Sequence, residues 1–416
     1  MTFRSILLSV GAGLALALSL SACDSFADDI DGFIDRVDTD SLDQQSAVPF
    51  LATGVEEGFN DSYDGVAVLA DLLSDAFIFD TDVQNATFPT FDEIDDAEIL
   101  LSNNSVDGVY NDINEMRFLA DDLLRRANET IEFSADDEGA EARRLALYTG
   151  NFYGGIARYT LATYFGLNPT EGGAPISESP DNLGPFIPSA QLYQQAIDRL
   201  TEAKNHTASD YETRLINTVL ARIHLFQGNL AQAGTLAASG LTADDAPFTG
   251  DYSPSSQNNW YTQGGIGRTQ VVVADRFEAF ADAEAGPVRV EPAPVVNGVT
   301  EDYFRQALYL TPDASIPFAS WEENALIRAE AALGTDATAA LGFVNAVREA
   351  AGLDALESID QAALIDARDL FLFTQGQRLV DMRRFGLPFV NHDGPVPGPW
   401  RYLPIPQNER NANPNF

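Results

Sequence analysis

Residues 221–237 read ARIHLFQGNLAQAGTLA, and this stretch predicts the fold of the chain. It continues an apolar stripe that begins at Leu215 with helical spacing and ends at the turn-forming pair Gly228-Asn229. A second, shorter helix is expected after the turn, because small and apolar residues recur at Leu230, Ala233, Leu236 and Ala237. Alanines at such positions let two helices approach closely. The stretch is therefore typical of a tetratricopeptide-like helical hairpin.

A second hairpin of the same kind is predicted near the C-terminus, where residues 325–352 read ALIRAEAALGTDATAALGFVNAVREAAG. Another helix is expected to begin at Ser189, an N-cap residue that follows a proline. Further helices are expected over 65–77, 106–128 and 140–165. Because such hairpins bury their apolar faces only by stacking, we predict a mainly α fold. The predicted architecture is a tetratricopeptide-like helical-hairpin solenoid with irregular loop insertions.

The region between the hairpins, at about 247–317, has a different composition. It contains clusters of Pro, Gly, Asn and Ser, a short β-rich run at 269–273, and no helical period. Insertions of this kind lie on one face of a solenoid and often form its binding surface. We therefore expect this insertion to contribute to the binding surface of the chain. The final stretch, 392–416, is rich in Pro and Asn and is expected to be an extended tail packed on the helices.

Two loop segments combine aromatic rings with amide side chains, which is the combination that a sugar ligand requires. Rings cover the C–H faces of a pyranose, while amides and carboxylates bond its hydroxyls. The segment 251–265 reads DYSPSSQNNWYTQGG and supplies Tyr252, Asn259, Trp260 and Tyr261. The segment 79–91 reads FDTDVQNATFPTF and supplies Asn85, Phe88 and Phe91. An aromatic pair is costly to leave in water, so either a ligand covers it or Trp260 anchors the loop on the helices. Both interpretations remain open at this level, whereas Trp321, Trp400 and Tyr402 are expected to be packing residues.

The N-terminus has the pattern of a bacterial lipoprotein signal. One positive charge, Arg4, precedes an uncharged apolar stretch that is too short for a comfortable membrane span. The stretch ends in Leu20-Ser21-Ala22-Cys23, which matches the lipobox, and Cys23 is the only cysteine in the chain. We therefore predict a signal peptide at 1–22 and a diacylglycerol on Cys23, against the alternative of an ordinary secretory signal. An acidic tether is expected at 23–45, followed by one helical domain at 46–416.

The charge balance excludes some partners. The chain of 416 residues holds 63 acidic and 24 basic residues and has a net charge of −39. Such a surface repels nucleic acid and anionic head groups, so we expect neither as a partner. Lys204 is the only lysine, and this composition is typical of proteins from high-salt organisms, where screening removes the self-repulsion. The alternative is an acidic protein from a GC-rich genome, in which arginine replaces lysine through codon bias.

The sequence offers little support for catalysis. Its three histidines are scattered, no glycine-rich phosphate loop precedes a helix, and 29–32 is only a fragment of a calcium loop. Among 63 acidic residues some pair will always resemble a glycosidase dyad, so such a pair carries little weight. We expect no enzyme, no metal site and no cofactor.

An ordered set of segments from residue 151 to the end resembles the SusD/RagB family of outer-membrane nutrient-binding lipoproteins. These segments are NFYGGIARYTLATYFG (151–166), LYQQAIDRLTEA (192–203), LARIHLFQGNLAQA (220–233), EENALIRAEAAL (322–333), FVNAVREAAGL (343–353), GQRLVDMRRFG (376–386) and YLPIPQNERNANPNF (402–416). The chain departs from the family pattern at Ala367, Phe371 and Gln375, where the family usually has Glu. These departures question details of helix packing more than the function.

The resemblance implies a lipid-anchored protein on the outside of the outer membrane. Such a protein captures an oligosaccharide, or in some relatives a peptide, and delivers it to a SusC-like TonB-dependent transporter. It acts as a lid on that transporter. The alternative is a tetratricopeptide-like scaffold lipoprotein that assembles envelope proteins and binds no nutrient.

Overall fold

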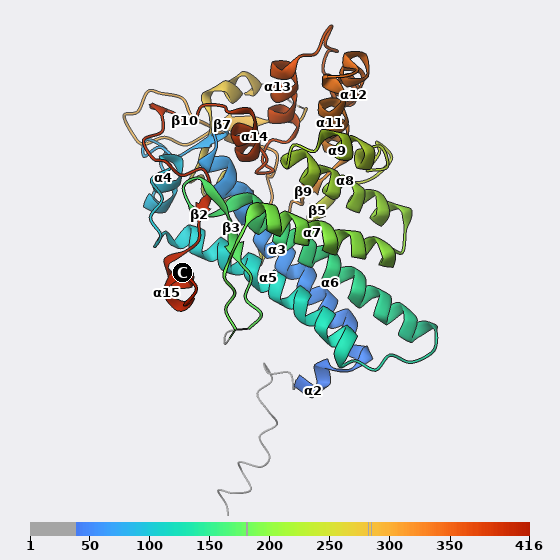
Figure 1. The fold of residues 1–416 in the computed structure, drawn as a ribbon. Helices are drawn as coiled ribbons and strands as arrows, with labels where there is room; N and C mark the ends of the chain where they lie inside the picture. Colours follow the sequence, from blue (N-terminus) through green and yellow to red (C-terminus); the bar gives the residue numbers. More distant parts are fainter. Residues whose placement is uncertain (1–38, 180–181, 282, 284) are drawn as a thin grey trace, which may run out of the picture.

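The computed structural model describes residues 39–179, 182–281, 283 and 285–416, and helices dominate it (Figure 1). The helices are α2 (Thr39–Leu42), η1 (Gln45–Ala47), α3 (Val48–Leu73), α4 (Pro89–Asp95), α5 (Asn104–Glu129), α6 (Asp137–Tyr164), α7 (Ser189–Ala203), η2 (Lys204–His206), α8 (Asp210–Phe226), α9 (Leu230–Ala237), α10 (Asn259–Thr262), η3 (Asp275–Phe280), α11 (Trp321–Leu333), α12 (Ala337–Ala350), α13 (Gln361–Phe371), α14 (Arg378–Phe385) and α15 (Gln407–Ala412). The predicted mainly α class is confirmed.

The strands are short. They are β1 (Phe77–Ile78), β2 (Phe165–Asn168), β3 (Glu171–Pro175), β4 (Phe186–Pro188), β5 (Phe248–Gly250), β6 (Val272–Val273), β7 (Val290–Pro292), β8 (Phe304–Gln306), β9 (Ile316–Ala319), β10 (Val390–Asn391), β11 (Gly394–Pro395) and β12 (Leu403–Pro404). The largest sheet has the order β12-β2-β3-β4, with β12 parallel to β2. The other sheets among the described residues have two strands each.

The helices α3, α5, α6 and α7 lie side by side and form the base of the molecule (Figure 1). Two glycines of α6 permit this packing. A Cβ atom on Gly150 would lie 2.5 Å from Leu124 Cγ on α5, and one on Gly155 would lie 2.8 Å from Leu200 Cγ on α7. Atoms cannot approach so closely without a shift of the helices, so α6 needs glycine at both positions.

The two predicted hairpins are present as α8–α9 and α11–α12. Their N-termini are capped by Ser209, Ser320 and Asp336, whose side chains accept backbone N–H groups of the first turn. A buried ion pair joins the hairpins, with Arg222 Nε on α8 lying 2.5 Å from Glu323 Oε1 on α11. The hairpins therefore stack as the solenoid prediction requires.

The helix boundaries differ from the predictions at the N-terminal side. The prediction of a helix over 65–77 missed the first part of α3, which begins at Val48. That part is amphipathic, with Val55 and Phe59 buried and Glu56 and Glu57 exposed, so its apolar content alone is low. The tether prediction is also wrong at its end. Residues 39–42 form α2, and Asp43 pairs with Arg126 at 2.5 Å.

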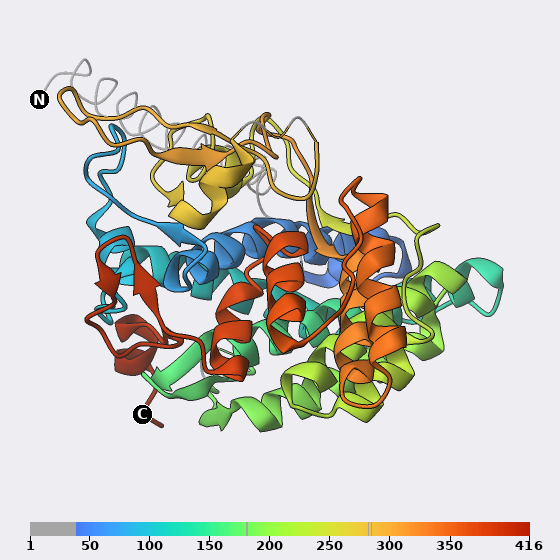
Figure 2. The ribbon, with the colours of Figure 1, turned by 90° about the horizontal axis from the view of Figure 1, so that it is seen from above.

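The insertion at 247–317 lies along one side of the helical stack, over α3 (Figure 2). Its ends are joined by the pairing of β5 with β9, and β6 pairs with β1, which follows α3. Only Val272–Val273 of the predicted β-rich run forms a strand. Two short helices, α10 and η3, occur where no helical period exists, because contacts with the helical stack stabilise single turns that local propensity does not.

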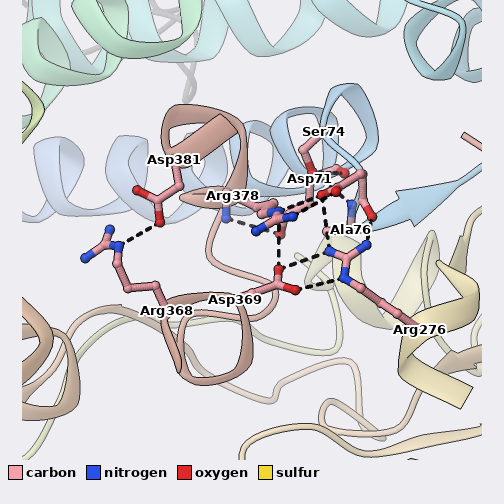
Figure 3. Close-up of polar contacts among 10 residues, drawn as sticks. Asp71, Ser74, Ala76, Arg276, Arg368, Asp369, Arg378 and Asp381 are labelled. Atoms are coloured by element: carbon pink, nitrogen blue, oxygen red, sulfur yellow. Dashed lines mark hydrogen bonds and ion pairs between the residues drawn. The ribbon is translucent and has the colours of Figure 1, made fainter. Parts of the chain in front are cut away.

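An ion-pair network fixes η3 to the helices (Figure 3). Arg276 of η3 and Arg378 of α14 both contact Asp75, which follows α3, and Asp369 of α13, at distances between 2.6 and 3.5 Å. Burial acts to raise the pKa of Asp75, but the hydrogen bond and charge of Arg378 and the charge of Arg276 outweigh it and lower that pKa. The network therefore holds η3, in the middle of the insertion, against α13 and α14.

The C-terminal tail is packed on the helices as predicted, but it is not wholly extended. Ile405 donates its backbone N–H to Gly166, and residues 407–412 form α15. No helix in the described ranges is long and apolar enough to cross a bilayer. Cys23, the predicted signal peptide and the tether up to residue 38 lie outside the described residues.

Candidate functional site

Trp260 anchors the insertion and does not face solvent. Its side chain is 0% exposed, its ring centroid lies 4.4 Å from that of Phe77, and its Nε1 donates to the Thr374 carbonyl at 2.8 Å. The prediction that Trp260 presents its ring to a ligand is therefore wrong, and the alternative interpretation, that it anchors the loop, is correct. Phe91 is likewise buried, against Phe88.

Asn259 is already engaged within the protein. Its backbone N–H and its side-chain Nδ2 both donate to Asp64 on α3, at 2.6 and 2.9 Å. Burial raises the pKa of Asp64 to about 7, although these two hydrogen bonds act against the rise. The neighbouring Asn258 caps α10, and its Nδ2 contacts three backbone carbonyls of the loop 311–314. Through these hydrogen bonds the two asparagines position the loop.

The remaining predicted residues are partly accessible. Tyr252, Tyr261, Asn85 and Phe88 are all half-buried. The Tyr252 hydroxyl is buried among the described residues without a hydrogen-bond partner, and it lies 2.7 Å from where a Cβ on Gly250 would stand. Tyr252 therefore packs with its hydroxyl turned inward, which leaves Tyr261, Asn85 and Phe88 as the candidates for ligand contact.

Gln270 brings the two predicted segments together, and sequence reasoning missed it. Its side chain is fully buried; Oε1 accepts the N–H groups of Thr87 and Phe88, and Nε2 donates to the Asn85 carbonyl. No local pattern marks a glutamine as a link between segments 185 positions apart. The consequence is that the segment 85–88 is held beside the loop that follows α10.

Arg268, next to Gln270, completes a small surface that we call the loop face. Its guanidinium lies 4.3 Å from the centre of the Phe88 ring and donates to Thr87 Oγ1 at 2.9 Å. Tyr261 belongs to the same loop, and its ring lies against Gly267, the residue before Arg268. The loop face consists of Asn85, Thr87, Phe88, Tyr261, Ile266 and Arg268, which are all partly or fully exposed. These residues offer aromatic rings, a cationic donor and an amide.

A larger hollow lies where the insertion meets α11, α12 and α13, and we call it the insertion cleft. Its volume is about 790 Å³. On the insertion side its wall includes Leu308, Tyr309 and Pro317, and on the helical side it includes Trp321 and Phe371. Trp321 packs against two hydrophobic clusters, as expected, and the accessible part of its half-buried side chain borders this cleft. The size is that of pockets that hold small-molecule ligands.

The described residues contain no cluster of histidine, cysteine and carboxylate side chains arranged to hold a metal ion. His392 lies 3.7 Å from Asp275 and 3.6 Å from Glu301, and His206 lies 2.9 Å from Glu202. Burial lowers the pKa of His224. The ion pairs of His392 and His206 join segments that lie next to each other, and none of them places a nucleophile beside a base.

The arginines of the C-terminal part pair mainly with residues of other elements. Arg378 pairs with Asp75. Asp381 pairs with Arg368 at 2.7 Å (Figure 3) and with Arg384 at 2.8 Å. Arg348 donates to the Asp354 carbonyl. These contacts are structural.

No family model matches the chain, and no curated protein matches it in sequence. Among solved structures, it is similar to a SusD superfamily protein from Bacteroides vulgatus, with a TM-score of 0.68, 17% identity, and coverage of 90% of this chain and 99% of the other.

Two further solved structures are surface glycan-binding proteins A. The one from Bacteroides uniformis has a TM-score of 0.68 and 15% identity, and covers 89% of this chain and 98% of its own. The one from Bacteroides thetaiotaomicron, in complex with laminarihexaose, has a TM-score of 0.67 and 14% identity with the same coverage. The likeness extends over nearly the whole of each partner and the main part of this chain, so the chain has the SusD-like fold.

Proposed function

We propose that this protein is a surface-exposed lipoprotein that binds a glycan and delivers it to a SusC-like TonB-dependent transporter. The observation that carries the proposal is the loop face, in which Gln270 holds the segment with Phe88 beside the loop that carries Arg268 and Tyr261. The shared fold with surface glycan-binding proteins supports it. In this proposal the protein is a binder, not an enzyme.

The loop face would hold a sugar by two kinds of contact. The rings of Phe88 and Tyr261 offer flat apolar surface for pyranose C–H groups, and this packing is the larger contribution. The Arg268 guanidinium and the Asn85 amide supply hydrogen bonds to ring hydroxyls, with Arg268 as donor only. Gln270 does not touch the ligand in this arrangement; it positions the segment that does.

The anchoring part of the proposal rests on the sequence. A diacylglycerol on Cys23 would tether the protein to the outer membrane, and the acidic residues that follow would keep the tether in solvent. The protein then closes as a lid over the transporter. The peptide ligands of some family relatives are the alternative cargo.

The binding site is tested with two variants of the full chain in detergent. Phe88→Leu keeps apolar bulk but loses the flat ring, and Arg268→Ala removes an exposed side chain that donates to the Thr87 hydroxyl. Each should weaken glycan binding about fivefold to tenfold in isothermal titration calorimetry, because one aromatic or hydrogen-bond contact is lost. Arg143→Ala, an exposed arginine on α6, is the matched control and should bind normally.

Unchanged affinity in both loop-face variants would contradict the assignment of the site. The partner is tested separately, by purifying the tagged protein from its native membrane. Recovery of a large outer-membrane barrel supports delivery to a transporter. Recovery of other envelope proteins without a barrel, together with no glycan binding, would favour the scaffold alternative.

A further inference from the structure

The insertion cleft has the properties of a binding site separate from the loop face. It lies between two parts of the fold, with the insertion on one side and the ends of the stacked helices on the other. Its volume of about 790 Å³ is within the range of ligand pockets. The loop-face residues do not border it. A ligand on the loop face would therefore not account for this cleft.

Aromatic residues border the cleft on both sides. Trp321 comes from the first turn of α11, whereas Tyr309 of the insertion, Phe371 and Phe373 are each no more than 8% exposed and complete the apolar lining. The Tyr309 hydroxyl is bonded to Thr374 at 3.2 Å, so Tyr309 offers no free donor. The half-buried indole of Trp321 is the largest ring that remains accessible in the lining. Such surface suits a ligand with an apolar face.

One polar side chain in the wall lacks a partner. Gln375 is 8% exposed, and its Oε1 is buried without a hydrogen-bond partner among the described residues, while its Nε2 makes a long contact of 3.4 Å with the Phe371 carbonyl. A buried amide oxygen without a donor is unfavourable, and native proteins rarely retain one without a reason. Gln375 also borders a small internal cavity beside Arg222. Its Oε1 could therefore accept a hydrogen bond either in the insertion cleft or in this internal cavity, and a variant is needed to distinguish the two.

The charges of the lining select against anions. Among the described residues, Glu322 and Asp245 border the cleft, and no lysine, arginine or histidine does. Asp245 is paired with Arg214 at 2.5 Å, so of these two carboxylates only Glu322 has no such partner in the described part of the chain. The groups on offer, a carboxylate and an amide oxygen, are hydrogen-bond acceptors. An uncharged ligand that donates several hydroxyl groups meets these requirements, whereas a uronate or a sulfated sugar meets repulsion.

We propose that the insertion cleft is a second binding site, for a neutral oligosaccharide, in which the Trp321 ring contacts a sugar face and Gln375 accepts a hydroxyl. The site is independent of the loop face, so its test can succeed or fail separately from the proposed function.

The binding test uses the full chain in detergent and the indole N–H NMR signal of Trp321, identified with Trp321→Phe. The chain has only three tryptophans, so the signals are resolvable. Laminarihexaose, maltohexaose, cellohexaose and mannohexaose are the neutral probes, and hexagalacturonate is the anionic counterpart. At least one neutral probe should shift the Trp321 signal, and the anionic probe should not. If no neutral probe shifts it, the proposal is overturned.

Two alanines of α12 provide a matched pair of blocking variants. Ala350 is exposed and borders the cleft, whereas Ala346 is exposed one turn earlier and does not. Ala350→Phe should weaken binding by the active probe by about tenfold or more because it fills the cleft, and Ala346→Phe should change it less than about twofold. Equal affinity in Ala350→Phe and Ala346→Phe would overturn the proposal.

Gln375→Met tests the acceptor at nearly constant volume. It should weaken binding about threefold to tenfold without lowering the melting temperature, because it removes an oxygen that has no partner within the protein. Unchanged binding would show that the oxygen serves the internal cavity and would remove Gln375 from the site. Phe88→Leu separates the two sites: the Trp321 shift should persist in it. Loss of that shift in Phe88→Leu would mean one continuous site and would overturn the proposal of a second one.

Discussion

At the scale of single residues, Trp260 shows that the sequence can be compatible with two opposite roles of one aromatic ring. An aromatic pair in a polar, glycine-bounded loop is compatible with ligand contact and with anchoring. The structure decides for anchoring, because the indole N–H of Trp260 reaches a carbonyl 114 positions away in the chain. Only a contact between distant segments distinguishes the two roles.

We predict that Trp260→Ala lowers the free energy of unfolding by about 3–5 kcal/mol, as expected for loss of a large buried aromatic side chain. The variant also leaves the Thr374 carbonyl without its donor. Chemical denaturation followed by circular dichroism measures the change. Trp260→Phe retains most of the ring volume and should be affected less. A Trp260→Ala variant with wild-type stability and weakened glycan binding would contradict the anchoring role.

At the scale of elements, Asp64 connects α3 to α10 and therefore to the loop face. Its carboxylate accepts both hydrogen bonds from Asn259, the first residue of α10. Asp64 is 2% exposed, and burial raises its pKa to about 7 from an ordinary value near 3.8. The two elements are thus joined through a group that changes its charge near neutral pH.

This raised pKa predicts a pH dependence of stability. The folded state binds the proton of Asp64 more tightly than the unfolded state, so its contribution is complete below about pH 4 and is lost as the pH rises through about 7. The free energy of unfolding should fall by up to about 4 kcal/mol over this window because of Asp64. Denaturant titrations at several pH values measure the fall.

Asp64→Asn should remove this part of the pH dependence, and Asp244→Asn, at an exposed position, should leave it unchanged. Other buried carboxylates with raised pKa values, Asp71 and Asp95, keep a similar dependence in both variants. The difference between wild type and Asp64→Asn is therefore the informative quantity. A difference that does not vary between about pH 4 and about pH 7 would contradict the titration of Asp64 in this range.

At the scale of the whole molecule, charge is the dominant feature. A net charge of −39 produces self-repulsion that ion pairs of the arginines offset only locally. We predict that the melting temperature rises by about 10 °C or more between about 0.05 M and about 2 M sodium chloride, because screening removes the long-range repulsion. Differential scanning calorimetry measures this rise.

The same experiment at about pH 4, where many carboxylates are protonated, should show a smaller effect of salt. This comparison separates screening from general effects of salt on apolar burial. A melting temperature that is the same in dilute and in molar salt at neutral pH would remove the halophilic interpretation. The scarcity of lysine would then reflect codon bias in an acidic protein from a GC-rich genome.

The helical hairpins could be predicted from the sequence because their signal is local. The apolar period, the turn at Gly228 and the alanines at the helix contacts all lie within a few turns of one another, and α8–α9 and α11–α12 follow them. The irregular insertion between the hairpins could also be predicted, from its proline and glycine content. The first part of α3 was missed because its polar face lowers its apolar content.

What lies on the surface of that insertion was decided by tertiary structure alone. Gln270, Asp64 and Thr374 each bond a residue that is more than 100 positions away, and these bonds determine that Trp260 is covered and that Phe88 and Tyr261 remain accessible. The insertion cleft likewise exists only where Tyr309 and Trp321 approach from different parts of the fold. Local periodicity determines which segments are helices, whereas exposure of a side chain depends on contacts between segments that no short window of sequence contains.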